Sequence, residues 1–179
     1  GTGRFRVNLF RQRGSIAAVV RVIRFGLPTA EEAHIPPEVM RAAQMKKGIV
    51  LVTGSAGSGK STTLACIINE INRTRTGHIL TLEDPVEYIH RHDKCIVSQR
   101  EIGCDCPSYV AALRSALRES PDVILLGEMR DKETMEVAMT AAETGQLLLS
   151  SLHTTGAANT IDRIIDAFPP NQQAQIRLQ

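Results

Sequence analysis

The chain has 179 residues, of which 42% are hydrophobic and 22% are charged, which suits one folded domain with a buried core and part of a second. Its net charge is only +2, and it has four Phe, two Tyr and no Trp. A broad nucleic-acid surface, which combines a basic stripe with stacking rings, is therefore not expected. No apolar run reaches the ~20 residues of a membrane-spanning helix and no signal peptide is visible, so we expect a cytoplasmic protein.

The cysteines do not form a metal-binding pattern. None of Cys66, Cys95, Cys104 and Cys106 belongs to a C-x-x-C pair, and no histidine cluster accompanies the C-x-C spacing at 104–106. Reduced thiols without a metal are the expected state.

The amino-terminal residues predict a β-hairpin. Residues 4–10 alternate apolar and polar side chains, as in a half-buried strand, and a second strand-like run covers 15–25. Prolines at 28, 36 and 37 then mark a linker and the start of a short helix near 38–44.

The chain starts without Met and stops inside an expected helix, so we expect a fragment of a longer protein. We assign residues 1–27 to the remnant of an amino-terminal domain, 28–36 to a linker and 37–179 to the main domain.

From Gly48 onward, apolar strands alternate with amphipathic helices, the pattern of an α/β fold whose sheet is covered on both faces. The expected strands are 48–53, 78–83, 122–127 and 146–152. The expected helices are 60–73, 107–119, 131–144 and 156–168, the last with an apolar stripe of Ile161, Ile164, Ile165 and Phe168.

Residues 54–61 fit the phosphate-binding pattern G-x-x-x-x-G-K-[ST], between an apolar strand and a helix. Glycines let successive backbone N–H groups face phosphate oxygens, and the positive end of the helix adds to this attraction. Lys60 is expected to reach the β- and γ-phosphates, and Ser61 to bind Mg²⁺. The expected nucleotide-binding residues are Gly54, Ser55, Ala56, Gly57, Ser58, Gly59, Lys60, Ser61 and Thr62.

Two further strands end in carboxylates, and ligands gather at the carboxyl ends of parallel strands. Glu128, after strand 122–127, is a candidate ligand for Mg²⁺ or its waters, with simple pairing to Arg130 as the alternative. Glu83, at the end of strand 78–83, is a candidate to position the attacking water. Asp84 is instead suited to a turn before proline, and Glu87 to a solvated position.

His153 follows the fourth strand, where it would either contact the γ-phosphate or serve as a structural histidine. Arg4, Arg6 and Arg13 lie near the amino end. They are either a solvated strand face or arginine fingers that act on the nucleotide of a neighbouring subunit.

Several segments resemble the secretion and pilus ATPases. Residues 117–131 are similar to the signature segment of that superfamily, 83–87 to its Asp box and 153–154 to its His box. Residues 141–145 and 153–165 are most similar to the retraction ATPases of twitching motility. A paired-cysteine zinc motif, typical of extension and type II secretion ATPases, is not seen.

The resemblance implies a RecA-like ATPase core preceded by the last strands of a PAS-like domain. It implies a homo-hexamer that hydrolyses ATP with Mg²⁺ and powers pilus retraction through a platform protein at the cytoplasmic face of the inner or plasma membrane. Glu83 would activate water, Glu128 would be the Walker B acid, and Arg4, Arg6 and Arg13 would act in trans. At Gln146 the family commonly has His, so this chain departs from the family pattern there.

Three alternatives remain open from the sequence. An extension or type II secretion ATPase would share the site. A nucleic-acid translocase would be stimulated by DNA or RNA in a salt-dependent manner. A nucleotide switch would bind ATP without turnover, which the acids Glu83 and Glu128 argue against.

Overall fold

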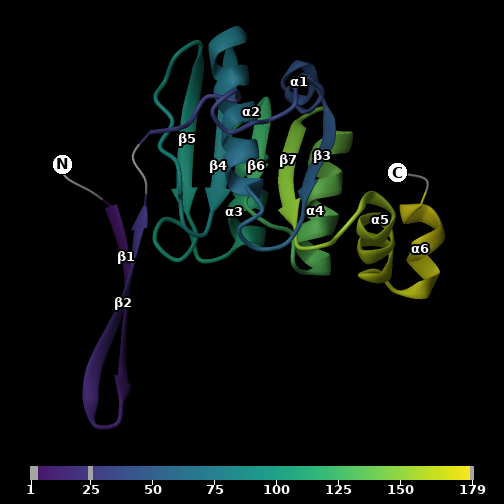
Figure 1. Ribbon diagram of the computed structural model, residues 1–179. Coiled ribbons are helices and arrows are strands. Elements are labelled where there is room, and N and C mark those ends of the chain that lie inside the picture. The colour runs from purple at the N-terminus through teal and green to yellow at the C-terminus, as the bar shows by residue number, and fades with distance from the viewer. Residues whose placement is uncertain (1–3, 24–25, 178–179) are drawn as a thin grey trace.

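The computed structural model describes residues 4–23 and 26–177. Its first two strands, β1 (Arg4–Gln12) and β2 (Ser15–Ile23), form an antiparallel hairpin that projects away from the rest of the molecule (Figure 1). The hairpin was predicted with one buried face, but Leu9 and Ile16 are 68% and 75% exposed. A two-stranded hairpin has no second layer to cover its apolar side chains. The proposed domain boundaries at 27 and 36 stay predictions.

The main body is built on a five-stranded sheet with the strand order β3-β7-β6-β4-β5. All neighbouring strands pair in parallel. The strands are β3 (Gly48–Thr53), β4 (Gly77–Glu83), β5 (Cys95–Glu101), β6 (Val123–Leu126) and β7 (Leu147–Leu152). Because the strands run in the same direction, their carboxyl ends meet at one edge of the sheet, where ligands bind in such folds.

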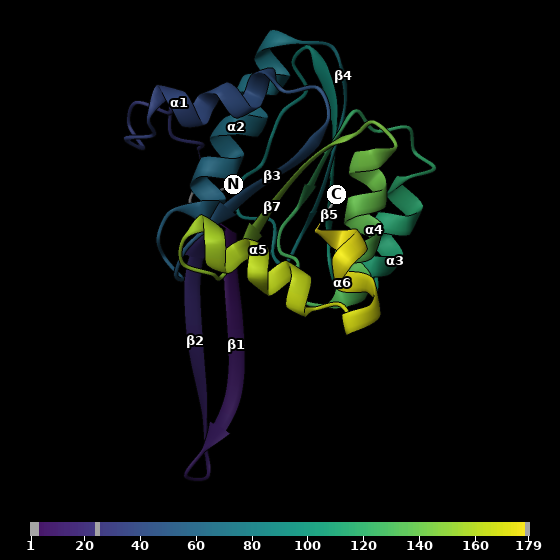
Figure 2. The same cartoon turned by 90° about the vertical axis from the view of Figure 1, so that its right-hand side faces the viewer.

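Helices cover both faces of the sheet, and Figure 2 shows it between them. One face carries α2 (Lys60–Thr74) with the short α1 (Pro37–Met40) and η1 (Arg41–Gln44). The other face carries α3 (Tyr109–Ala116) and α4 (Lys132–Glu143). Two apolar clusters, one on each face, bury side chains of the strands from both sides, which is what a parallel sheet requires.

The last two helices, α5 (Ala157–Asp166) and α6 (Pro170–Ile176), lie beyond β3 at the edge of the sheet (Figure 1). Of the predicted apolar stripe, Ile165 and Phe168 are buried, whereas Ile161 is 59% exposed. The stripe was therefore only partly correct, because α5 packs at a sheet edge and not across a full face.

The predicted α/β class, with its four strands and the helices between them, is confirmed to within a few residues. The helix predicted at 107–119 is shorter, and it begins after Ser108, whose Oγ accepts a hydrogen bond from the Ala111 N–H at 3.2 Å. The edge strand β5 was not predicted. Its second half, residues 98–101, is polar and half-buried, so β5 lacks the continuous apolar run that marks the central strands.

No helix within 4–23 and 26–177 is long and apolar enough to cross a membrane. Cys66, Cys95 and Cys106 are buried free thiols, and Cys104 is exposed. Burial raises the pKa of the Cys66 thiol, so this cysteine stays protonated and packs as a small apolar side chain.

Candidate nucleotide-binding and catalytic site

A cleft of about 470 Å³ opens at the carboxyl ends of the strands. Its walls come from the loop after β3, the ends of β4, β6 and β7, the start of α3 and strand β2 of the hairpin. It is lined by Arg21, Ala56, Gly57, Lys60, Ser61, Glu83, Asp84, Pro85, Glu87, Tyr109, Gly127, Glu128, Arg130, Ser151 and His153. The adjacent pair Lys60 and Ser61 thus shares one cleft with Glu83, Glu128 and His153, which come from distant parts of the sequence.

The loop after β3 has the geometry of a phosphate cradle. Gly54, Gly57 and Gly59 have φ angles of 148°, 77° and 92°, which favour glycine. A Cβ on Gly54 would also lie 2.7 Å from the Ser58 Oγ. The Lys60 side chain is 9% exposed, and its Nζ donates hydrogen bonds to the carbonyl oxygens of Gly54 at 2.9 Å and Ser55 at 2.8 Å. The ammonium group is therefore held across the loop, next to the start of α2.

Glu128 lies directly after β6 and is held from two sides. Its Oε1 is 2.6 Å from the Arg130 Nε, and its Oε2 is 3.7 Å from the His153 Nε2. The Glu128 side chain is only 13% exposed, whereas the Arg130 and His153 side chains are 76% and 55% exposed. The Arg130 pair that the sequence left as an alternative is present, and it engages Oε1, while Oε2 lies beside His153, another residue that lines the cleft.

Glu83 ends β4 on the opposite wall of the cleft. Burial raises its pKa, and the nearby charge of Glu87 acts in the same direction, while hydrogen bonds to Glu83, including one from Gln99, oppose the rise. The Gln99 Nε2 lies 3.4 Å from the Glu83 Oε1. A carboxylate whose pKa is raised is a better proton acceptor than a solvated one.

The structure places the amino-terminal arginines differently from one another. The Arg6 Nη2 is 3.6 Å from the Asp84 Oδ1 of the same chain, so Asp84 is an ion-pair partner in addition to a turn residue. Arg13 lies in the hairpin turn, away from the sheet (Figure 1). Arg4 belongs to β1, but its side chain lies outside the described part of the structure.

Arg21 was not predicted, yet it lines the cleft. Arg6 and Arg21 are directly opposite in the register of the hairpin. Like charges in such a cross-strand pair repel each other unless an anion lies nearby. Pairing the two predicted strands across the turn would have been the signal, because it places the two arginines opposite each other.

Tyr109 was also missed. Its hydroxyl approaches Gly127 so closely that a Cβ built on this glycine would lie 2.9 Å from the Tyr109 Oη. Burial raises the pKa of Tyr109, and the nearby carboxylate of Glu128 adds to the rise. The phenol therefore stays protonated and brings a hydrogen-bond donor into the cleft, a function that its position at the start of an amphipathic helix did not indicate.

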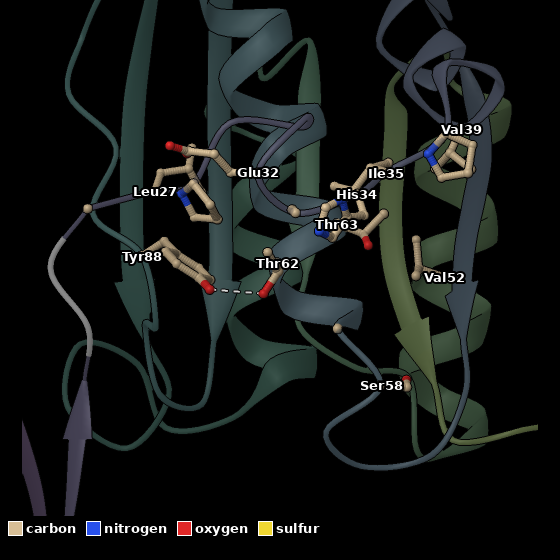
Figure 3. A pocket seen from close by; sticks show the side chains of 15 residues that line it. Leu27, Glu32, His34, Ile35, Val39, Val52, Ser58, Thr62, Thr63 and Tyr88 are labelled. Carbon is tan, nitrogen blue, oxygen red and sulfur yellow. Dashed lines mark hydrogen bonds between the residues drawn. The ribbon is translucent and has the colours of Figure 1, made fainter.

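A second, larger cleft of about 810 Å³ lies on the other side of the loop (Figure 3). Its walls come from residues 26–28 and 32–36, Val39, Val52, the loop residues Ser58 and Gly59, Thr62 and Thr63 of α2, and Tyr88. The Tyr88 Oη and the Thr62 Oγ1 are 2.9 Å apart and form a hydrogen bond. The predicted binding residues thus border two clefts, one rich in charged groups and one that is mainly apolar but also includes Glu32 and His34.

Residues 17–172 match the family described as type II/IV secretion system protein. The chain belongs to this family. It is 51% identical over 177 residues to the type IV pilus retraction ATPase PilT of Pseudomonas aeruginosa, covering 99% of this chain and 52% of that protein. It is 52% identical over 174 residues to a twitching motility protein of Neisseria gonorrhoeae, covering 97% of this chain and 46% of that protein. The resemblance deduced from the motifs is confirmed.

Two solved structures have the same fold as this chain. The crystal structure of the pilus retraction motor PilT with bound ADP matches with a TM-score of 0.95 and 54% identity, covering 99% of this chain and 52% of that one. The DotB ATPase of Legionella pneumophila matches with a TM-score of 0.82 and 32% identity, covering 98% and 54%. The chain spans about half the length of the curated relatives that it matches.

Gln146 precedes β7, at the opposite end of that strand from His153. Its Oε1 accepts a hydrogen bond from the Thr144 Oγ1 at 2.8 Å, and its carbonyl oxygen accepts one from the Gly48 N–H at 3.1 Å. Gln146, which replaces the histidine common in the family, therefore lies away from the cleft. Its hydrogen bond to Gly48 joins the starts of β3 and β7.

Proposed function

We propose that the chain binds ATP with Mg²⁺ and hydrolyses it to ADP and phosphate, as the ATPase core of a motor that retracts type IV pili. The observation that supports this most strongly is the shared cleft of Lys60, Ser61, Glu83 and Glu128. The triphosphate would lie along the loop at the start of α2. The nucleoside would extend into the larger cleft beside Tyr88, where the lining is apolar enough to cover a base.

The residues at the cleft fit Mg²⁺. Ser61 and Glu128 offer oxygen ligands from two sides of the same cleft. No group of three His, Cys, Asp or Glu side chains among the described residues is suited to hold a metal ion, so phosphate oxygens and waters would complete the coordination. When bound, the ion would neutralise charge on the β- and γ-phosphates.

Glu83 would act as the general base. It accepts a proton from the attacking water while the water oxygen forms a bond to the γ-phosphorus, and the bond from that phosphorus to the bridging oxygen breaks to release ADP. Lys60 and Arg21 supply positive charge on two sides of the γ-phosphate, where negative charge must be stabilised in the transition state. His153, through its position beside Glu128, would contact the γ-phosphate from the third side.

Because Arg21 lines the cleft of its own chain, it would act on the nucleotide bound to the same subunit. Arg6 would also contact this nucleotide once its ion pair with Asp84 opens. Arg4 and Arg13 stay candidates for action on a neighbouring subunit. That assignment needs the homo-hexamer that the family resemblance implies.

The cellular role follows from similarity to proteins named for pilus retraction and twitching motility. In this proposal, the whole protein forms a hexamer at the cytoplasmic face of the membrane, without entering it. Rotation of its domains would act on a platform protein of the pilus machine. An extension or type II secretion ATPase is the runner-up, since proteins named type II secretion system protein E, one of them as putative, share 44–45% identity over shorter stretches.

The test is ATP hydrolysis by the protein that carries this chain, over a range of protein concentrations and with or without DNA. Lys60→Ala and Glu83→Gln should abolish turnover. Lys47→Ala and Glu143→Gln, which change exposed residues outside both clefts, should leave it unchanged. The rate of ATP turnover per subunit should rise as the subunits assemble and should not change when DNA is added.

Three results would contradict the proposal. Undiminished turnover in Lys60→Ala would show that the loop does not bind the phosphates. Turnover that requires DNA would favour a translocase. Tight ATP binding without turnover in the unaltered protein would favour a switch.

A further inference from the structure

Gln99 lies in the edge strand β5, in register with Thr81, two residues before Glu83 on the neighbouring strand. Three hydrogen bonds surround its side-chain amide. The Oε1 accepts one from the His90 N–H at 2.7 Å. The Nε2 donates to the Tyr88 carbonyl oxygen at 2.9 Å and to the Glu83 Oε1 at 3.4 Å.

The orientation of this amide is set by the backbone of residues 88–90 and not by Glu83. Because the His90 N–H can only donate and the Tyr88 carbonyl can only accept, the Gln99 oxygen must face His90 and its nitrogen must face Tyr88. The second N–H of the amide is then available to the Glu83 carboxylate. At 3.4 Å this contact is long, as contacts of catalytic groups commonly are before substrate binds.

The segment that holds Gln99 is itself tied to α2, the helix that follows the glycine-containing loop. The Tyr88 hydroxyl forms its hydrogen bond with Thr62 of α2, as the dashed line in Figure 3 shows. A chain of contacts therefore runs from α2 through Tyr88 and Gln99 to Glu83. It joins the lining of the larger cleft to the carboxylate in the smaller one.

We propose that Gln99 is a positioning residue for ATP hydrolysis, which holds Glu83 Oε1 so that Oε2 is directed at the attacking water. This inference rests on the proposed function, in which Glu83 is the base. A carboxylate that can rotate freely spends less time in the geometry needed for proton transfer. Gln99 lines neither cleft, so its effect should appear in kcat and not in the KM for ATP.

Two substitutions separate this role from simple support of the backbone. Gln99→Glu keeps the length of the side chain and the acceptor for the His90 N–H, but it loses the donor and places a second carboxylate beside Glu83. Gln99→Leu loses all three hydrogen bonds. Gln175→Glu and Gln175→Leu, at an exposed position on α6, are the matched controls.

The experiment measures kcat and KM for ATP, together with thermal stability, in these variants and in Lys60→Ala. We expect kcat to fall about threefold to tenfold in Gln99→Leu and more than tenfold in Gln99→Glu, with KM within about twofold of the unaltered protein. The Gln175 controls should match the unaltered protein. If Gln99→Leu does not fold, the comparison of Gln99→Glu with its control still tests the proposal.

Three outcomes would overturn the proposal: unchanged kcat in Gln99→Glu, a smaller loss in Gln99→Glu than in Gln99→Leu, or a raised KM with unchanged kcat. The second would mean that Gln99 only braces residues 88–90, and the third that it acts on nucleotide binding. Failure of the proposed function is distinguishable, because it would appear as undiminished turnover in Lys60→Ala.

Discussion

Replacing Gly127 by alanine should destabilise the protein, because the added Cβ would lie too close to three neighbouring atoms. The added Cβ would lie 2.9 Å from the Tyr109 Oη, 3.3 Å from the Leu82 carbonyl oxygen and 3.4 Å from the Glu83 Cα. Gly127 does not have a positive φ, so the cost is steric and does not come from backbone strain. Overpacking of this kind typically costs about 1–3 kcal/mol.

The closest of these contacts is with the Tyr109 hydroxyl and can be removed separately. Tyr109→Phe alone should change stability by less than about 0.5 kcal/mol, because no described residue forms a hydrogen bond with this hydroxyl. In the Tyr109→Phe background, Gly127→Ala should cost at least about 1 kcal/mol less than in the unaltered protein. The two backbone contacts remain, so part of the cost should persist.

Urea denaturation of the two single variants and the double variant measures this coupling. With a typical urea dependence of about 2 kcal/mol per molar, Gly127→Ala should lower the midpoint by roughly 0.5–1.5 M. Tyr88→Phe, which removes a phenol oxygen in the other cleft, is the control and should be additive with Gly127→Ala. An equal cost of Gly127→Ala with and without the Tyr109 hydroxyl would refute the steric reasoning.

Three further predictions concern charge. Because burial raises the pKa of Glu83 above 4.5, its ionised form opposes folding, so Glu83→Gln should raise the melting temperature at pH 8, a gain that disappears below pH 4.5. Equal melting temperatures at pH 8 would contradict this. Burial lowers the pKa of His90 from 6.5 to about 4, so the unfolded chain takes up a proton first and stability should fall as the pH drops from 6.5 to 4. Urea midpoints across this range should vary less in His90→Gln, and an unchanged slope would count against a buried neutral histidine. Arg21→Ala should lower the kcat for ATP at least about tenfold, whereas Arg11→Ala in the same hairpin should not, and equal effects would argue for a general role of hairpin charge.

Local patterns were sufficient for much of the fold and for part of the site. The central strands are continuous apolar runs and the helices have one apolar face, so the spacing of apolar residues was enough to predict their positions. The loop at 54–61 combines glycines with a lysine at the spacing of a phosphate-binding loop, and the structure holds the Lys60 Nζ against carbonyl oxygens of this loop. Contact of Lys60 with a phosphate stays a prediction. The strand β5 was missed, because its second half, residues 98–101, is polar, as is typical of an edge strand.

The sequence by itself determined which chemical groups lie at the ends of the strands, because each carboxylate, hydroxyl or histidine comes just after an apolar run in the chain. The tertiary structure decided which of these groups meet. The order β3-β7-β6-β4-β5 depends on contacts between residues far apart in the chain, and local periodicity carries no information on them. For the same reason Tyr109, which lines the cleft from α3, and Gln99, which contacts Glu83 from β5, became visible only in the structure, since their own sequence neighbourhoods do not connect them to the ends of the other strands.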